Sequence, residues 1–88
     1  MNITVNRKFL KDLAKLPADQ QQKIEHLVFE ESERVTSLEE IKGIKKLQGY
    51  QIYYRIRFGD YRVGIRYEDE AMVFERVLHR KDIYRYFP

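Results

Sequence analysis

Hydrophobic residues near the N-terminus recur every three or four positions, a spacing that predicts amphipathic helices. After a short β-type run at residues 3–5, Asn6 can cap a first helix, because asparagine accepts hydrogen bonds from the first helical turn. Pro17 ends this helix, since proline lacks a backbone donor and disfavours helix at the preceding residue. The expected apolar face consists of Phe9, Leu10, Leu13 and Leu16.

The same spacing predicts a second amphipathic helix over residues 18–35, so the chain is expected to begin with a helical hairpin. Ser37, followed three residues later by Glu40, predicts a capping box for a short turn over residues 38–42. The expected buried side of the second helix consists of Ile24, Leu27, Val28 and Val35.

Hydrophobic and polar residues alternate with a period of two in the second half of the chain, which is typical of half-buried strands. Residues 50–58 and 61–67 both alternate in this way, and Gly59-Asp60 between them is the signal of a two-residue turn. Residues 71–78 alternate poorly, so this strand is expected to be central and buried on both faces, or bulged.

Two helices, a meander of strands and a short helical tail over residues 81–87 predict the α+β class, with the helices packed on one face of an antiparallel sheet. No composition shift, repeat or Pro/Gly/Ser-rich linker divides the 88 residues, so a single domain over residues 1–88 is expected.

The predicted hairpin brings basic residues together on one face. If Gly59-Asp60 is the turn, positions two apart along each strand share that face. The expected opposed pairs are Arg57 with Arg62, Arg55 with Gly64, and Tyr53 with Arg66. Two directly opposed arginines repel each other by about 0.2–1 kcal/mol, and an anion bound between them would turn this repulsion into attraction. Gly64 would leave backbone uncovered for a ligand. The alternative is a solvated arginine face.

Charge and composition narrow the possible partners. Residues 1–44 carry seven Lys and Arg against eight Asp and Glu, whereas residues 45–88 carry ten against six. A basic half with seven arginines favours a polyanionic partner, or is a solubilising surface. There is no cysteine, no apolar run of about 20 residues and no signal-peptide pattern. A cytoplasmic protein without a membrane partner is therefore expected.

A second candidate cluster follows the last predicted strand. His79 and Arg80 are delivered to its end, where His79 can titrate near neutral pH or can be purely structural. Tyr84 and Tyr86 can stack on bases, or can pin the tail to the sheet. His26, the other histidine, lies in the second helix and is expected to be structural.

No cofactor and no metal site is expected, because the histidines are far apart and the acidic residues lack ligand spacing. A nuclease made of these residues would act on RNA, whose ribose 2′-hydroxyl attacks the adjacent phosphorus. Such an enzyme stabilises the transition state with cations and moves protons with general acids and bases.

Three segments together resemble the RelE/ParE toxin superfamily: Ile44-Lys45-Lys46-Leu47-Gln48-Gly49, Tyr54 to Val63, and Val77 to Arg85. The resemblance implies a two-helix, four-stranded antiparallel fold and a cognate antitoxin as partner. RelE-like members cleave mRNA in the ribosomal A site without a metal. ParE-like members instead inhibit DNA gyrase without that catalytic set, which is the alternative function.

The resemblance also implies site residues. Arg55 and Arg57 match the basic residues of the first hairpin strand, Arg62 the arginine after the turn, and Arg80 the arginine at the end of the last strand. The tail tyrosine is Tyr84 or Tyr86.

The remaining substrate-binding candidates are Lys45, Lys46, Tyr53 and Arg66, together with Arg55. RelE-like members carry lysines where this chain has Arg55 and Arg57, and arginine does not act as a general base. The base would then be His79 or a tail tyrosine.

Overall fold

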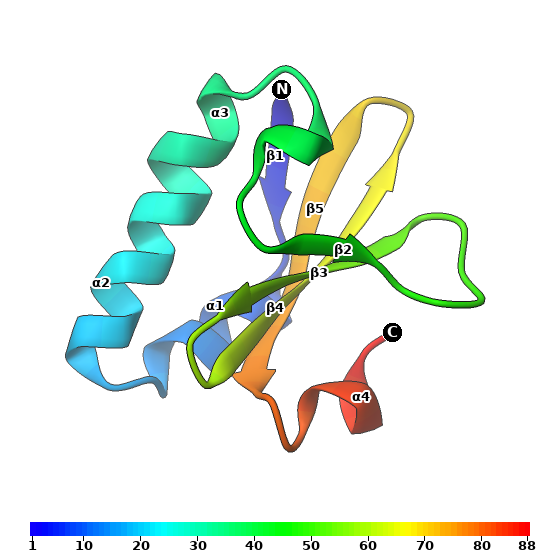
Figure 1. The fold of residues 1–88 in the computed structure, drawn as a ribbon. Coiled ribbons are helices and arrows are strands. Elements are labelled where there is room, and N and C mark those ends of the chain that lie inside the picture. The colour runs from blue at the N-terminus through cyan, green and yellow to red at the C-terminus, as the bar shows by residue number, and fades with distance from the viewer.

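A five-stranded sheet carries the N-terminal helices on one face and a short C-terminal helix on the other (Figure 1). The computed structural model describes residues 1–88. Its elements are β1 (Asn2–Val5), α1 (Arg7–Ala14), α2 (Ala18–His26), the π-helical turn η1 (Leu27–Glu31), α3 (Ser32–Arg34), the 3₁₀ turn η2 (Leu38–Glu40), β2 (Ile44–Lys46), β3 (Tyr53–Phe58), β4 (Tyr61–Glu68), β5 (Ala71–His79) and α4 (Ile83–Tyr86). No helix in the chain is long and apolar enough to cross a membrane.

Two helices follow β1 as predicted, but the hairpin that they form differs in detail from the expected one. Asn6 caps α1, and its side-chain Oδ1 accepts a hydrogen bond of 2.9 Å from the backbone of Phe9. Leu10 is an exception to the predicted apolar face, because its side chain is 49% exposed. It lies about 100° around the helix from Phe9, so it points away from the sheet while Leu13 remains buried.

The second predicted helix is interrupted rather than regular. Residues of α2, η1 and α3 follow one another without a break, and η1 is a π-helical turn. The buried Ser32 hydroxyl donates a hydrogen bond of 2.8 Å to the carbonyl of Leu27, five residues earlier. The backbone N–H of Ser32 donates to the same carbonyl, so the π turn gives both the hydroxyl and the N–H of this buried residue an acceptor.

The sheet differs from the four-stranded antiparallel one that the sequence suggested. Its order is β1-β5-β4-β3-β2, and β1 pairs with β5 in parallel, so the sheet is five-stranded and mixed. The first strand of the chain, β1, is thus an edge strand of the sheet and lies next to the last strand, β5. β3 begins at Tyr53 rather than Tyr50, because residues 47–52 form the loop that joins the very short strand β2 to β3.

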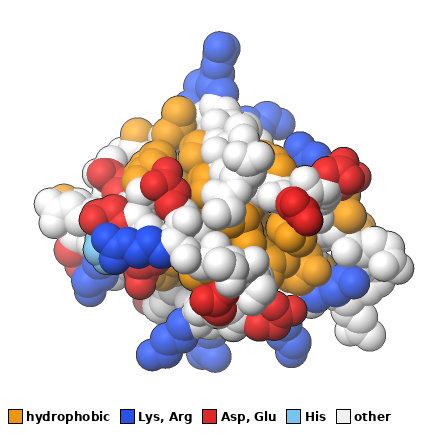
Figure 2. All heavy atoms as spheres, turned by 90° about the horizontal axis from the view of Figure 1, so that it is seen from above, with side chains coloured by type: hydrophobic (Ala, Val, Ile, Leu, Met, Phe, Trp, Pro, Cys, Tyr) orange, Lys and Arg blue, Asp and Glu red, His pale blue; other side chains and the backbone are white.

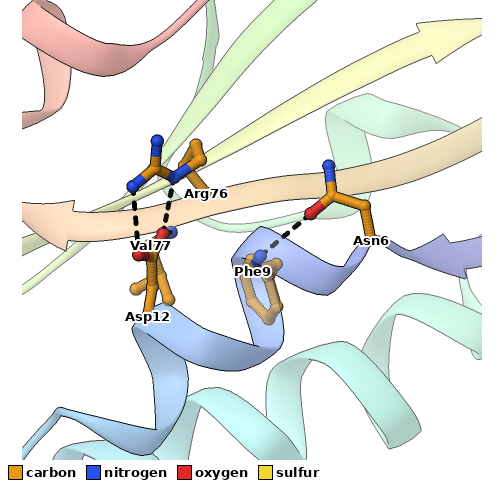
Figure 3. Close-up of polar contacts among 5 residues, drawn as sticks. All are labelled: Asn6, Phe9, Asp12, Arg76 and Val77. Carbon is orange, nitrogen blue, oxygen red and sulfur yellow. Dashed lines mark hydrogen bonds and ion pairs between the residues drawn. The ribbon is translucent and has the colours of Figure 1, made fainter.

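β5 lies between β1 and β4 and is bulged rather than buried on both faces, which is the second of the two arrangements that its poor alternation indicated. Gly64 of β4 pairs with Arg76, whereas Ile65 pairs with Phe74, which leaves Glu75 as an extra residue. The bulge turns Arg76 towards α1, where its guanidinium donates to both carboxylate oxygens of Asp12 at 2.7 and 3.1 Å (Figure 3).

The chain has hydrophobic packing on both faces of the sheet. The main core lies between the sheet and α1 to η1, and includes Phe9, Ile24, Ile65 and Phe74. Ile83 and Phe87 are also buried but lie outside that core, where the C-terminal segment covers the opposite face of the sheet.

Gly64 is covered rather than open to a ligand, so the expectation of uncovered backbone at this position was wrong. A Cβ atom built on Gly64 would lie 2.7 Å from ring carbons of Phe87. The missing side chain therefore makes room for the phenylalanine ring of the tail.

Candidate active site

The hairpin register predicted from the turn is confirmed. Arg57 pairs with Arg62, Arg55 with Gly64, and Tyr53 with Arg66, and Lys45 of β2 extends the row by pairing with Arg55. Directly paired residues project to the same side of a sheet. These side chains therefore occupy the face remote from α1 to α3, because the alternate residues Ile56, Val63 and Ile65 belong to the main core.

The guanidinium of Arg62 is bonded to backbone carbonyls of the hairpin. Its Nη1 donates to the carbonyls of Gly59 and Tyr61 at 2.8 and 2.9 Å, which holds the guanidinium beside the hairpin turn. Burial, and then repulsion from Arg57 and other arginines, lowers the pKa of Arg62 below its ordinary value. Arg62 also forms no ion pair with an Asp or Glu side chain.

The groups that act electrostatically on Arg62 define a cluster. They are Arg57, Arg55, Tyr84 and Arg80, and no Asp or Glu is among them. We call Arg55, Arg57, Arg62 and Arg80 the arginine cluster. The basic character is local, since the end of the molecule seen in Figure 2 carries Lys and Arg intermixed with Asp and Glu.

Backbone contacts hold this cluster in place. The backbone N–H of Arg80 donates to the carbonyl of Asp60 at 2.8 Å, which ties the end of β5 to the hairpin turn. Arg55 Nη1 donates to the carbonyl of Gly43 at 3.2 Å, and the backbone N–H of Arg57 donates to the same carbonyl at 3.0 Å. Gly43 has a φ of +83°, so it takes a backbone conformation that favours glycine.

Tyr84 and Tyr86 lie in different surroundings. Tyr84 is 60% exposed and lies near enough to Arg62 to contribute electrostatically to the pKa of that arginine. The ring of Tyr86 instead lies 5.8 Å from the guanidinium carbon of Arg76, which is bound by Asp12. The structure thus brings Tyr84 to the arginine cluster, and uses Tyr86 to pin the tail to the α1 side of β5.

His79 lies apart from the arginine cluster. It pairs with Tyr61, which packs against the main core, so the histidine projects to the face opposite Arg62. Its ring lies 5.6 Å from the ring of Tyr61, and its Nδ1 accepts a hydrogen bond of 3.1 Å from the backbone of Lys81. His79 is thus a half-buried strand-end residue bonded to backbone.

Arg66 and Tyr53 are occupied by contacts within the chain. Arg66 is bonded to Glu75 at 2.9 Å and to Glu68 at 3.1 Å, and the bond to Glu75 raises the pKa of Arg66. The ring of Tyr53 packs edge-on against Phe87, with 5.6 Å between the ring centroids. Lys45 and Lys46 of β2 are exposed.

Two structural contacts near the site were missed from the sequence. Asp12 lies on the buried face of α1, where it binds Arg76 and also accepts a hydrogen bond of 3.2 Å from the backbone of Val77 (Figure 3). An acidic residue within an apolar helical face was the signal that could have revealed it. The packing of Phe87 on Gly64 gave no comparable signal. His26 is exposed and lies 2.9 Å from Glu30 within the same helical segment.

The chain contains no group of three or more His, Cys, Asp or Glu side chains arranged to hold a metal ion. The arrangement present can bind a phosphate through several guanidinium groups, with one tyrosine hydroxyl beside them.

Comparison with known proteins gives matches over nearly the whole chain. Residues 3–84 match the family model described as the ParE toxin of the type II toxin–antitoxin system parDE. Toxin RelE3 of Methanocaldococcus jannaschii is 45% identical over 89 residues, which cover 100% of both chains. Putative toxin RelE1 of the same organism is 28% identical over 87 residues, covering 96% of this chain and 94% of the relative.

Solved structures give the same result. The RelB–RelE antitoxin–toxin complex from Methanococcus jannaschii contains a chain with a TM-score of 0.80 and 39% identity, covering 97% of this chain and 99% of that one. The toxin–antitoxin complex RelBE2 from Mycobacterium tuberculosis contains one with a TM-score of 0.71 and 27% identity, covering 90% of this chain and 96% of that one.

Proposed function

The chain belongs to the RelE/ParE family of toxins from type II toxin–antitoxin systems, and from this premise we propose that it is an endonuclease that cleaves mRNA in the ribosomal A site. The observation that carries the proposal is the direct pairing of Arg57 with Arg62 in an arginine cluster that has Tyr84 beside it and no carboxylate bonded to Arg62. The arginines repel one another, which destabilises the hairpin, and a bound phosphate would remove this repulsion.

The arginine cluster binds and polarises the scissile phosphate in this proposal. Arg57 and Arg62 face each other across the hairpin, so a phosphate between them accepts hydrogen bonds from both sides. Arg62 is already held by the carbonyls of Gly59 and Tyr61, and this preorganisation lowers the cost of stabilising the charge that develops on the phosphate oxygens.

The ribose of the mRNA supplies the nucleophile. Its 2′-oxygen forms a bond to phosphorus while the bond from phosphorus to the 5′-oxygen breaks, leaving a 2′,3′-cyclic phosphate and a 5′-hydroxyl. One proton leaves the 2′-hydroxyl and one reaches the 5′-oxygen. Tyr84 is the group beside the cluster that can exchange a proton, since arginine stays protonated. We assign it a part in these transfers in preference to His79, which projects to the other face, and to Tyr86, which packs on Arg76.

A cognate antitoxin is the expected protein partner. Both solved structures described above are complexes of a toxin with its antitoxin. An uncompensated arginine cluster favours an acidic antitoxin segment, because opposite charge speeds association. Coexpression with the product of the neighbouring reading frame should give a stable complex, and failure to copurify would contradict this part of the proposal.

Inhibition of DNA gyrase, implied by the ParE-like branch, is the less favoured function. The relative that matches the whole chain at 45% identity is named Toxin RelE3. The toxin in the matched RelB–RelE complex is likewise named RelE.

Toeprinting of a defined mRNA on translating ribosomes tests the proposal. We expect a new mRNA end inside the A-site codon, which requires ribosomes and is absent with Arg62→Ala. A supercoiling assay with DNA gyrase runs in parallel. Intact mRNA together with blocked supercoiling would overturn the proposed function in favour of the alternative.

A further inference from the structure

One groove of the surface is not explained by phosphate binding. It has a volume of about 520 Å³ and lies between the loop that joins β2 to β3 and the C-terminal tail. Its lining includes Lys45, Lys46, Gln48, Tyr50, Arg55 and Tyr84. Arg55 and Tyr84 also act on Arg62, so the groove adjoins the arginine cluster.

The charge of this groove sets it apart from the other hollows of the surface. No Asp or Glu lines it, whereas each of the other four hollows is lined by at least one acidic residue. The positive charges of Lys45, Lys46 and Arg55 are therefore not neutralised within the groove. A groove of this kind favours a ligand attached to a polyanion.

Two exposed aromatic rings line the same groove. Tyr50 is 46% exposed and Tyr84 is 60% exposed, although large aromatic side chains usually bury most of their surface. Exposed rings beside a basic groove are the feature by which proteins bind single-stranded nucleic acids, because bases stack on them.

The loop that carries Tyr50 is held in shape. Leu47 and Tyr50 are joined across a turn by a hydrogen bond of 3.2 Å, and Gly49 within the turn has a φ of +85°. The ring of Tyr50 packs edge-on against Tyr53 at 5.6 Å between centroids. Gln48 occupies the corner of the turn, where its amide offers both donors and an acceptor to a base edge.

We propose that this groove, formed by Gln48 and Tyr50 of the loop together with Tyr84 of the tail, is a nucleobase subsite. It binds one base of the single-stranded RNA next to the phosphate that the arginine cluster holds. This proposal rests on the proposed function for the identity of the RNA. Tyr50 supplies stacking surface, and Gln48 discriminates among bases.

The binding test uses a short 2′-O-methyl oligoadenylate and the same backbone without bases. The wild type should bind the oligoadenylate more tightly, and Tyr50→Ala should remove most of that difference while binding the base-free backbone as before. Loss of one stacked base corresponds to a weakening of roughly 5-fold to 150-fold. Tyr50→Phe should restore binding, because it keeps the ring.

The matched control is Phe29→Ala, which removes an aromatic side chain of similar exposure, 47%, from the helical side of the chain. It should bind both probes as the wild type does. Equal effects of Tyr50→Ala on the oligoadenylate and on the base-free backbone would overturn the subsite.

A cleavage test on programmed ribosomes separates the subsite from the proposed function. Tyr50→Ala should raise the half-saturating concentration more than it lowers the maximal rate, and Gln48→Ala should change the ranking of codons. If the wild type cleaves and both variants keep its concentration dependence and codon ranking, the subsite is wrong while the proposed function stands. If the wild type does not cleave, the proposed function fails, and the oligonucleotide binding test still decides the subsite. Variants that change only the affinity for the antitoxin would assign the groove to that partner and overturn the inference.

Discussion

Gly64→Ala tests how the C-terminal tail is attached to the sheet. The new Cβ would lie 2.7 Å from Phe87 ring carbons, whereas ordinary contact begins near 3.4 Å, so the ring has to move by about 0.7 Å or leave its site. Phe87 is only 2% exposed and its backbone N–H is bonded to the carbonyl of Ile83 at 2.8 Å, so little free space is available. Overpacking of this kind costs about 1–3 kcal/mol.

In the absence of the Phe87 ring, Gly64→Ala should change the free energy of unfolding in the opposite direction. Glycine in a strand is less favourable than alanine by about 0.5–1 kcal/mol. In a Phe87→Ala background the clash is gone, so Gly64→Ala should be neutral or stabilising. The two substitutions should therefore be coupled by about 1–3 kcal/mol.

Guanidinium unfolding of the wild type, both single variants and the double variant measures this coupling. RNA cleavage should also fall in Gly64→Ala, since Tyr84 lies on the α4 segment that Phe87 anchors. Equal destabilisation by Gly64→Ala in both backgrounds, within about 0.5 kcal/mol, would refute the packing argument.

Three further predictions concern other parts of the chain. Asp12→Ala should destabilise the fold by about 3 kcal/mol in thermal or denaturant unfolding, because it leaves Arg76 and the backbone N–H of Val77 without their acceptor. A loss of stability below about 1 kcal/mol would contradict this role. Hydrogen bonds from Thr36, and then from Ser37, lower the pKa of the Glu40 carboxyl below 4.5. Its ionised form therefore stabilises the fold above pH 4.5, the contribution is lost as pH falls below that value, and Glu40→Gln should show a weaker acid dependence of unfolding. Arg62→Ala should remain folded and lose about 10²-fold to 10³-fold in cleavage rate, whereas Arg85→Ala, an exposed arginine of α4, should keep the wild-type rate.

The hairpin was predictable because its register depends on a local signal. A two-residue turn at Gly59-Asp60 determines which residues pair, so the opposition of Arg57 and Arg62 followed directly from the sequence. The parallel pairing of β1 with β5 depends instead on contacts between the two ends of the chain, which no local pattern encodes. β2 is too short for its alternation to be visible.

The composition of the site was only partly predictable. The arginines were found because they sit on regular strands, where side-chain direction alternates. The sequence did not show whether His79 or Arg80 faces the arginines, because the bulge at Glu75 of β5, opposite Gly64 and Ile65 of β4, changes which side chains face them. Tyr84 and Tyr86 were not separable by pattern matching. On a helix they differ by about 200°, so only one of them can face the cluster.

The claim that the arginine cluster and Tyr84 form the active site is tested most directly by single-turnover cleavage of mRNA on programmed ribosomes. The rates to compare are those of Tyr84→Phe and His79→Ala. Loss of the tyrosine hydroxyl should lower the rate about 10²-fold or more with the fold intact, as expected for a general acid or base, and His79→Ala should cleave at nearly the wild-type rate. A wild-type rate in Tyr84→Phe, with a loss of that size in His79→Ala, would contradict the account.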